Sequence, residues 1–216
     1  MEHEQELREL TINSIRELGL AIEENHVEQF MRYLAHLIEW NRGINITSVV
    51  DPRDIIVKHF VDSLASLVSI NFPKNCTVLD IGSGGGFPGI PLRIIRPDIR
   101  LILVEPVQKK CSFLNSVIGL LRLQSVFVFN GTIEQYAKNQ LHYLIDMVVI
   151  RALKYEGILK HIPALLAPNG KIVLYRTKAI KGHDFGKEFH VMSETALTLP
   201  QETGNRVITV IEKTGS

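Results

Sequence analysis

The stretch VLDIGSGGGFPGIPL, residues 78–92, decides the fold class of this chain. A short apolar run leads to the acidic Asp80, and five glycines then fall within the eight positions 82–89. The apolar run before Asp80 is typical of a strand buried in a parallel sheet. Glycine has no Cβ, so a loop this rich in glycine lets its backbone approach a ligand closely. The stretch therefore predicts a cofactor loop after a buried strand, and the glycine spacing must identify the cofactor class.

The spacing argues against the common nucleotide fingerprints. In the dinucleotide motif G-x-G-x-x-G the third glycine would stand where this chain has Phe87, and no Walker-type lysine follows the glycines. Glu105 ends the next apolar run, 25 residues after Asp80, where an acidic residue that accepts hydrogen bonds from a ribose is expected. The pattern that is present, D-x-G-x-G-x-G, resembles the first motif of methyltransferases that use S-adenosylmethionine (SAM), and it consists of Asp80, Gly82, Gly84 and Gly86.

Apolar runs alternate with helical patterns along the rest of the chain. This alternation predicts βαβ units and a parallel sheet. The last two runs follow each other with no helix between them, which predicts an antiparallel hairpin over residues 188–213. The expected fold class is α/β, a Rossmann-like class I SAM-dependent methyltransferase with a mostly parallel sheet closed by a C-terminal antiparallel hairpin. The expected strands are TVLDI, LILVE (101–105), SVFVF (125–129), LIDMVVI (144–150) and KIVLY (171–175), with helices near 88–96, 108–119 and 154–166.

The N-terminal third of the chain predicts a small helical extension. Apolar residues recur there at helical spacing over 7–18 and 27–38, and a third helix is expected after Asp51 and Pro52, which match an N-cap and a first-turn proline. The segment NFPKN, residues 71–75, is expected to be a linker. We therefore divide the chain into an N-terminal helical region, 1–72, and a SAM-binding domain, 73–216.

Composition limits the partners and the compartment. Lys and Arg number 24 and Asp and Glu number 23, so any contact with nucleic acid must come from a local basic patch. No apolar run reaches the roughly 18 residues that span a membrane. Cys76 and Cys111 have neither metal-ligand nor disulfide-framework spacing, which fits a reducing compartment. We expect a cytoplasmic monomer that contains no metal.

The segment after the fourth expected strand limits the methyl acceptor. It reads VVIRALKYE and lacks the Asn/Asp-Pro-Pro-aromatic motif of enzymes that methylate exocyclic amino groups. Cys76 and Cys111 lie elsewhere, so no cysteine nucleophile for carbon methylation is expected. The acceptor is therefore an atom that is nucleophilic without help, and no general base is required.

Several segments together resemble one family across nearly the whole chain. They are WNRGINITSV (40–49), HFVDS (59–63), DIGSGGGFPGIPL (80–92), Ile133-Glu134 and RAL (151–153). The chain is similar in these segments to the RsmG (GidB) family. The resemblance implies SAM-dependent methylation of ring nitrogen 7 of a guanosine in 16S ribosomal RNA, with the small ribosomal subunit as partner.

The resemblance also implies roles for single residues. Gly82 and Phe87 would line the cofactor pocket, Ile133 and Glu134 would flank the adenine, and Arg151 would stand at the cofactor and the mouth of the site. Counted with the motif residues, the expected cofactor-binding set is Asp80, Gly82, Gly84, Gly86, Phe87, Glu105, Ile133, Glu134 and Arg151.

Other residues are expected to position the substrate. His59 and Asp62, three apart on one helix, are expected to pair beside the cofactor and to assist Arg151 in positioning. Asp62 and Glu134 are candidates to stabilise the cationic product. The chain departs from the family at Lys154 and at YRTK (175–178), so either Arg176 or Lys178 takes the place of a family lysine. The expected RNA-binding residues are Arg176, Lys178, Arg42 and Lys58, and Arg32, Arg93 and Arg96 are further candidates for a phosphate-binding rim.

Two other functions are compatible with the same fold. A methyltransferase for a small molecule would use the N-terminal helices as a lid over the pocket. A non-catalytic module would bind SAM or RNA without turnover, although the intact glycine motif, Glu105 and Arg151 argue against it. A positively charged surface around the SAM pocket would favour RNA as the substrate, and a closed apolar lid would favour a metabolite.

Overall fold

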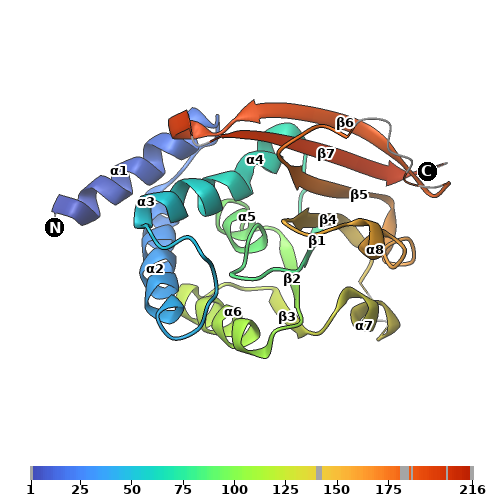
Figure 1. Cartoon of the computed structure of the whole chain (residues 1–216), viewed down its shortest axis with the longest axis horizontal. Helices are drawn as coiled ribbons and strands as arrows, with labels where there is room; N and C mark the ends of the chain where they lie inside the picture. The colour runs from blue at the N-terminus through green and yellow to red at the C-terminus, as the bar shows by residue number, and fades with distance from the viewer. Residues whose placement is uncertain (1, 140–142, 181–184, 186, 203, 215–216) are drawn as a thin grey trace.

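One twisted sheet organises the molecule (Figure 1). The computed structural model describes residues 2–139, 143–180, 185, 187–202 and 204–214. The described strands form a seven-stranded sheet in the order β3-β2-β1-β4-β5-β7-β6. Neighbouring strands pair in parallel from β3 to β5, and β7 pairs antiparallel with both β5 and β6. This arrangement confirms the predicted fold class. The strands are β1 Thr77–Ile81, β2 Arg100–Glu105, β3 Val126–Asn130, β4 Ile145–Arg151, β5 Leu166–Arg176, β6 Phe189–Thr198 and β7 Asn205–Lys213.

The helices between the strands agree with the sequence pattern except after β3 and after β4. The helix expected over 154–166 is wrong, because only a four-residue helix forms there before β5 begins at Leu166. Pro163 explains the difference, since a proline inside a helix lacks an N–H donor and clashes with the preceding turn. A short helix after β3 was not predicted, and the capping box of Thr132 and Gln135 begins it. The helices of this part are α5 Gly89–Ile95, α6 Gln108–Leu121, α7 Ile133–Lys138 and α8 Glu156–Leu159.

The N-terminal extension is helical, as predicted. The Asp51 side chain caps the third helical segment by accepting a hydrogen bond from the Asp54 N–H at 3.0 Å. That segment continues without a break through a π-helical turn, which carries His59, into an α-helix that starts at Asp62. The elements are α1 Glu2–Glu17, α2 Glu24–Asn41, α3 Pro52–Ile55, the π-helix η1 Ile56–Val61 and α4 Asp62–Ser69.

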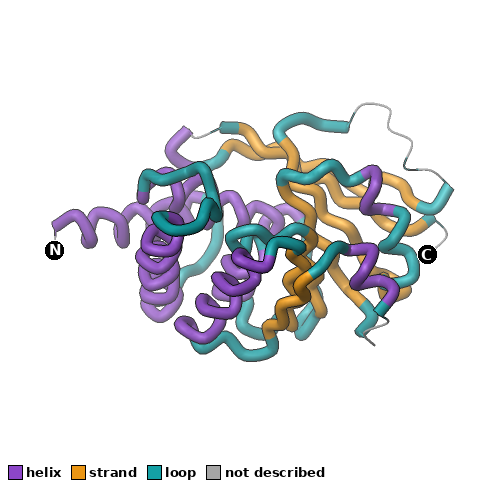
Figure 2. Tube along the Cα trace, turned by 60° about the horizontal axis from the view of Figure 1, so that its bottom comes forward, coloured by secondary structure: helices purple, strands orange, loops and turns teal. Residues whose placement is uncertain are grey.

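Two apolar layers cover the two faces of the sheet. Alternate residues of a strand point to opposite faces. Val78 therefore packs with the N-terminal helices, α5 and α6, whereas its neighbour Leu79 packs with α7 and α8. Figure 2 shows most helices on one side of the strands, with the short helices α7 and α8 on the other. The N-terminal helices share their core with the sheet, and the domain boundary predicted after residue 72 stays a prediction.

Two general expectations concern the environment of the chain. Cys76 and Cys111 are both free and buried. Within the described ranges, no helix has both the length and the apolar character needed to span a bilayer.

Candidate active site

The three motif glycines meet different demands. Gly82, Gly84 and Gly86 all have positive φ, at 72°, 56° and 92°, a conformation that favours glycine. A Cβ on Gly82 would overlap the side chain of Leu153, and one on Gly86 would lie 2.5 Å from Ile90 and 2.7 Å from the Tyr33 hydroxyl. A Cβ on Gly84 would meet nothing closer than 3.9 Å. Gly86 therefore serves the packing of the loop on the N-terminal helices, whereas Gly84 faces open space.

Glu105 connects the glycine loop to the loop after β2. Its side chain is 4% exposed, and its two oxygens accept hydrogen bonds from the N–H groups of Gly84 (2.8 Å) and Val107 (2.9 Å). A carboxylate can accept up to about four hydrogen bonds, so capacity remains for a ligand. The sequence predicted that Glu105 contacts a ribose. It did not predict that Glu105 also links the two loops by accepting hydrogen bonds from their N–H groups.

A cavity of about 330 Å³ opens beside this loop. Four of the predicted cofactor residues line it, namely Gly82, Gly84, Glu105 and Ile133. The bare backbone at Gly84 and the carboxylate of Glu105 suit a ribose and the chain attached to it, and the apolar Ile133 suits a planar base. The residues present therefore fit SAM. We refer to this space as the cofactor cavity.

The other predicted cofactor residues do not line the cofactor cavity. Asp80 is fully buried, and its Oδ2 accepts a hydrogen bond at 2.9 Å from the N–H of Gly89, the first residue of α5. Burial raises the pKa of Asp80 to about 7. Glu134 is exposed and pairs with Lys138 at 2.7 Å. Gly86 and Phe87 support the loop from behind, so the contacts predicted between these residues and the cofactor stay predictions.

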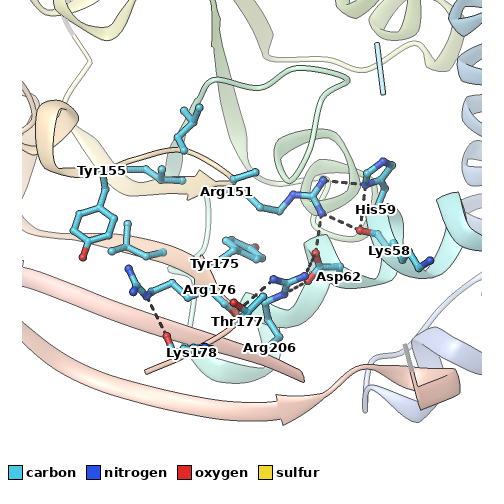
Figure 3. A pocket seen from close by; sticks show the side chains of 14 residues that line it. Lys58, His59, Asp62, Arg151, Tyr155, Tyr175, Arg176, Thr177, Lys178 and Arg206 are labelled. Carbon is cyan, nitrogen blue, oxygen red and sulfur yellow. Dashed lines mark hydrogen bonds and ion pairs between the residues drawn. The ribbon is translucent and has the colours of Figure 1, made fainter. Parts of the chain in front are cut away.

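A second cavity, of about 550 Å³, lies at the carboxyl ends of β4 and β5 (Figure 3). Ligands bind at this edge of open α/β sheets. Three of the four predicted RNA-binding residues line it, namely Lys58, Arg176 and Lys178. Arg42 does not, because it follows the end of α2 and lines a separate hollow with Ile38 and Val50. We refer to the second cavity as the basic cavity.

A buried carboxylate between two arginines forms one wall of the basic cavity. Asp62 is 1% exposed, and Arg206 contacts both of its oxygens, with Nε at 2.6 Å and Nη2 at 2.8 Å. Arg151 donates to the same carboxylate from Nη1 at 2.8 Å. A buried charge is tolerated when it is paired and hydrogen-bonded in this way. Because both oxygens are held by arginines, Asp62 orients cations, which speaks against its predicted role at a cationic product.

His59 and Asp62 do not pair with each other, so this part of the prediction is wrong. The guanidinium of Arg151 lies between them and contacts both side chains (Figure 3). His59 Nε2 instead lies 2.7 Å from the Thr47 hydroxyl, and its ring stacks on Phe87 with 4.6 Å between centroids. Burial and the neighbouring Arg151 lower the pKa of His59 to about 4.

The remaining basic residues divide into two groups. Arg176 donates to the Lys178 carbonyl at 3.1 Å and lies over the Tyr155 ring, and Lys178 is exposed. The further rim candidates bind backbone carbonyls instead: Arg32 that of Leu120, Arg93 that of Gln124 and Arg96 those of Phe72 and Pro73. These three side chains act within the fold and do not line the basic cavity.

Two residues of the site were missed from the sequence. Arg206 lies near the hairpin turn and belongs to no recognisable sequence motif. Only the need of the buried Asp62 carboxylate for cationic partners could have indicated it. Leu153 lines both the cofactor cavity and the basic cavity, so the two spaces adjoin at its side chain. In the described part of the chain, no group of three or more His, Cys, Asp or Glu side chains could hold a metal ion.

One known protein family matches most of this chain. The profile of the family described as "GidB: rRNA small subunit methyltransferase G" matches residues 26–208. The chain belongs to the GidB family. A relative named ribosomal RNA small subunit methyltransferase G from Roseiflexus sp. (strain RS-1) is 35% identical over 204 residues, which cover 94% of this chain and 83% of the relative. One from Staphylococcus epidermidis (strain ATCC 12228 / FDA PCI 1200) is 31% identical over 208 residues, covering 92% and 87%.

Solved structures support the fold of this GidB protein. MtNAS in complex with MTA and tNA superposes with a TM-score of 0.59 at 15% identity, over 97% of this chain and 86% of that one. The glycopeptide N-methyltransferase MtfA complexed with sinefungin gives 0.58 at 12% identity, over 73% and 87%. Family membership and fold together make the protein a SAM-dependent methyltransferase of the small-subunit ribosomal RNA.

Proposed function

We propose that the protein transfers the methyl group of SAM to ring nitrogen 7 of a guanosine in 16S ribosomal RNA, with the guanine bound in the basic cavity. One observation carries this proposal: the cofactor cavity and the basic cavity adjoin at Leu153. A methyl donor in the first and a base in the second would be neighbours. We further propose that Gly82, Gly84, Glu105 and Ile133 hold SAM.

The side chains at the site fit an acceptor that needs no base. Nitrogen 7 of guanine has an in-plane lone pair and no proton, so the new carbon–nitrogen bond forms as the carbon–sulfur bond breaks and no proton is transferred. His59 would be a poor general base, because its pKa is lowered to about 4 and Arg151 contacts its Nδ1. SAM supplies the electrophilic methyl group. The protein contributes orientation of the base and exclusion of water.

Charge around the basic cavity supports RNA as the substrate. Among the described residues, its lining has the five cationic side chains of Lys58, Arg151, Arg176, Lys178 and Arg206 and one carboxylate, that of Asp62. A groove of about 840 Å³ continues from it along the β6–β7 hairpin and shares Thr177, Lys178 and Arg206 with it, and none of the described residues that line this groove carries a carboxylate. Phosphates on both sides of an inserted guanosine would be neutralised along this path.

The N-terminal helices do not resemble the lid that a small-molecule enzyme would need. Phe30 and Tyr33 of α2 are fully buried against Phe60 and Phe87. The helices therefore support the glycine loop from behind. We propose that they form the region 1–72 beside a SAM-binding domain 73–216, and that the protein acts as a cytoplasmic monomer, in keeping with its two free cysteines.

Mass spectrometry of nucleosides from cellular 16S rRNA tests the proposal. Cells that lack this gene should lose 7-methylguanosine from one site, and the wild-type gene should restore it. A variant with Gly84→Val, whose branched side chain would fill the cofactor cavity, should not restore it. If the nucleoside profile is the same with and without the gene, the proposed reaction is wrong.

A further inference from the structure

We propose that Thr47, in the loop after α2, holds His59 as the Nε2–H tautomer, so that the bare Nδ1 of His59 orients the guanidinium of Arg151 in the basic cavity. In this proposal Thr47 and His59 are positioning residues for methyl transfer. The activity part of the proposal rests on the proposed function, whereas the tautomer itself does not.

The side chain of Asn41 fixes the loop that carries Thr47. Its Oδ1 accepts hydrogen bonds from the N–H groups of Ile46 (2.8 Å) and Thr47 (3.0 Å), and its Nδ2 donates to the Thr47 carbonyl at 2.9 Å. The Thr47 hydroxyl accepts from the Val49 N–H at 3.1 Å. Contacts that do not involve His59 therefore hold both the backbone and the side chain of Thr47 in place.

The contacts of His59 determine its tautomer. An arginine side chain only donates hydrogen bonds, and Arg151 Nη2 lies 3.2 Å from His59 Nδ1. Nδ1 must therefore be the acceptor, and the single ring proton of the neutral imidazole lies on Nε2. That proton donates to the Thr47 hydroxyl at 2.7 Å. A proton on Nδ1 would point to the Lys58 carbonyl at 3.1 Å, but it would also face the donor of Arg151.

The surroundings keep the imidazole neutral and fixed. The charged groups that act on His59 are the cations Arg151 and Lys58, and together with burial they hold its pKa well below the ordinary value. The ring of Phe87 stacks on one face of the imidazole and also lies under the guanidinium of Arg151, at 5.4 Å from the ring centroid. His59 thus connects the N-terminal extension, the glycine loop and the end of β4.

Arg151 keeps donors for a substrate. A guanidinium has five N–H donors. Three of those of Arg151 contact the Lys58 carbonyl, Asp62 Oδ2 and His59 Nδ1. The Nε–H and the second Nη2–H have no partner among the described residues, and the side chain lines the basic cavity. Because the other three donors are fixed, the direction of these two is fixed as well.

The tautomer can be measured directly by nitrogen-15 NMR of the imidazole in the free, ligand-free protein. We expect His59 in the wild type to show a protonated Nε2 and a bare Nδ1 at both pH 6 and pH 8. Thr47→Val, which keeps the shape of the side chain and removes the acceptor, should weaken this preference, and Thr47→Ser should keep it. A wild-type His59 that is protonated on Nδ1, or that titrates between those pH values, would overturn the proposal.

Activity measurements test the consequence for the reaction. With unmodified small ribosomal subunits as substrate, Thr47→Val should lower kcat by about tenfold through misplacement of Arg151, with little change in SAM affinity. Thr47→Ser should recover most of the loss, and Ser48→Ala, at the exposed neighbouring position, should resemble the wild type. Equal kcat for Thr47→Val and the wild type would contradict the positioning role.

The outcomes separate this proposal from the proposed function. If the wild type methylates no rRNA, the proposed function fails, while the NMR spectrum of the wild type still decides the tautomer. If Thr47→Val does not fold, judged by its thermal unfolding curve, the wild-type spectrum and the kcat of Thr47→Ser decide. A loss of activity in Thr47→Ser as large as that of a folded Thr47→Val would count against the hydroxyl.

Discussion

Glu105 combines an observed role in the fold with a proposed role in cofactor binding. Its oxygens hold the N–H groups of Gly84 and Val107, and they face the cofactor cavity. Removing the carboxylate therefore costs more than a ribose contact, because two backbone donors lose their partner. The effect on binding and the effect on stability have to be separated by the choice of substitution.

Glu105→Gln and Glu105→Ala make this separation. Gln keeps one acceptor oxygen and removes the charge, so we expect weaker SAM binding, by about 1–3 kcal/mol, with a smaller loss of stability than in Ala. Calorimetric titration with SAM and thermal unfolding measure the two quantities. If Glu105→Gln binds SAM as tightly as the wild type, the ribose role of Glu105 is wrong.

Asp80 gives the protein a predictable dependence of stability on pH. Burial raises its pKa in the folded state to about 7, whereas an unfolded aspartate titrates near 3.9. Between these values the folded state holds the extra proton, so the free energy of unfolding should fall as pH rises from about 4 to about 7. Asp80→Asn should lack this contribution. Urea unfolding of the wild type and of Asp80→Asn at pH 5 and pH 7.5 measures this contribution. If the free energy of unfolding changes equally with pH in the two proteins, the prediction is wrong.

At the scale of the elements, the end of β5 and the turn after it form the proposed substrate-binding edge. Arg176 and Lys178 line the basic cavity and have no acidic partner among the described residues. Lys58, by contrast, is neutralised by Asp54 at 2.9 Å. Arg176 and Lys178 are therefore the cations with the most freedom to bind phosphates.

Arg176→Ala combined with Lys178→Ala tests this edge. We expect at least about a tenfold loss in apparent affinity for the rRNA substrate, with a salt dependence shallower by about one log–log unit per lost phosphate contact. SAM affinity should not change. Arg53→Ala with Lys74→Ala, at two exposed positions outside both cavities, is the matched control. If the variant with Arg176→Ala and Lys178→Ala has unchanged affinity for the rRNA and an unchanged salt dependence, the RNA does not bind at this edge.

The sequence predicted these elements unevenly, for physical reasons. The glycine loop and the hairpin were predictable because their constraints are local: bare backbone after a buried strand, and two strand patterns with a short turn. The helix predicted over 154–166 does not form as a whole, because the apolar periodicity of this segment favours a helix but Pro163 interrupts it. Arg206 and Thr47 could not be found, since their partners Asp62 and His59 lie 144 and 12 residues away and only the fold brings them together.

At the scale of the whole molecule, three layers converge on one edge of the sheet. The glycine loop and Glu105 line the cofactor cavity, the ends of β4 and β5 line the basic cavity, and the N-terminal helices hold His59 and Asp62 against Arg151. The extension is thus part of the proposed active site.

One measurement tests the central claim most directly. The purified protein is incubated with SAM labelled in its methyl group and with small ribosomal subunits from cells that lack the gene, and the rRNA is digested to nucleosides. We predict that the label appears in 7-methylguanosine from 16S rRNA, and that it is absent when Gly84→Val replaces the wild type. Label in another nucleoside would contradict the account. So would the absence of label from the rRNA when the wild-type protein is folded and binds SAM.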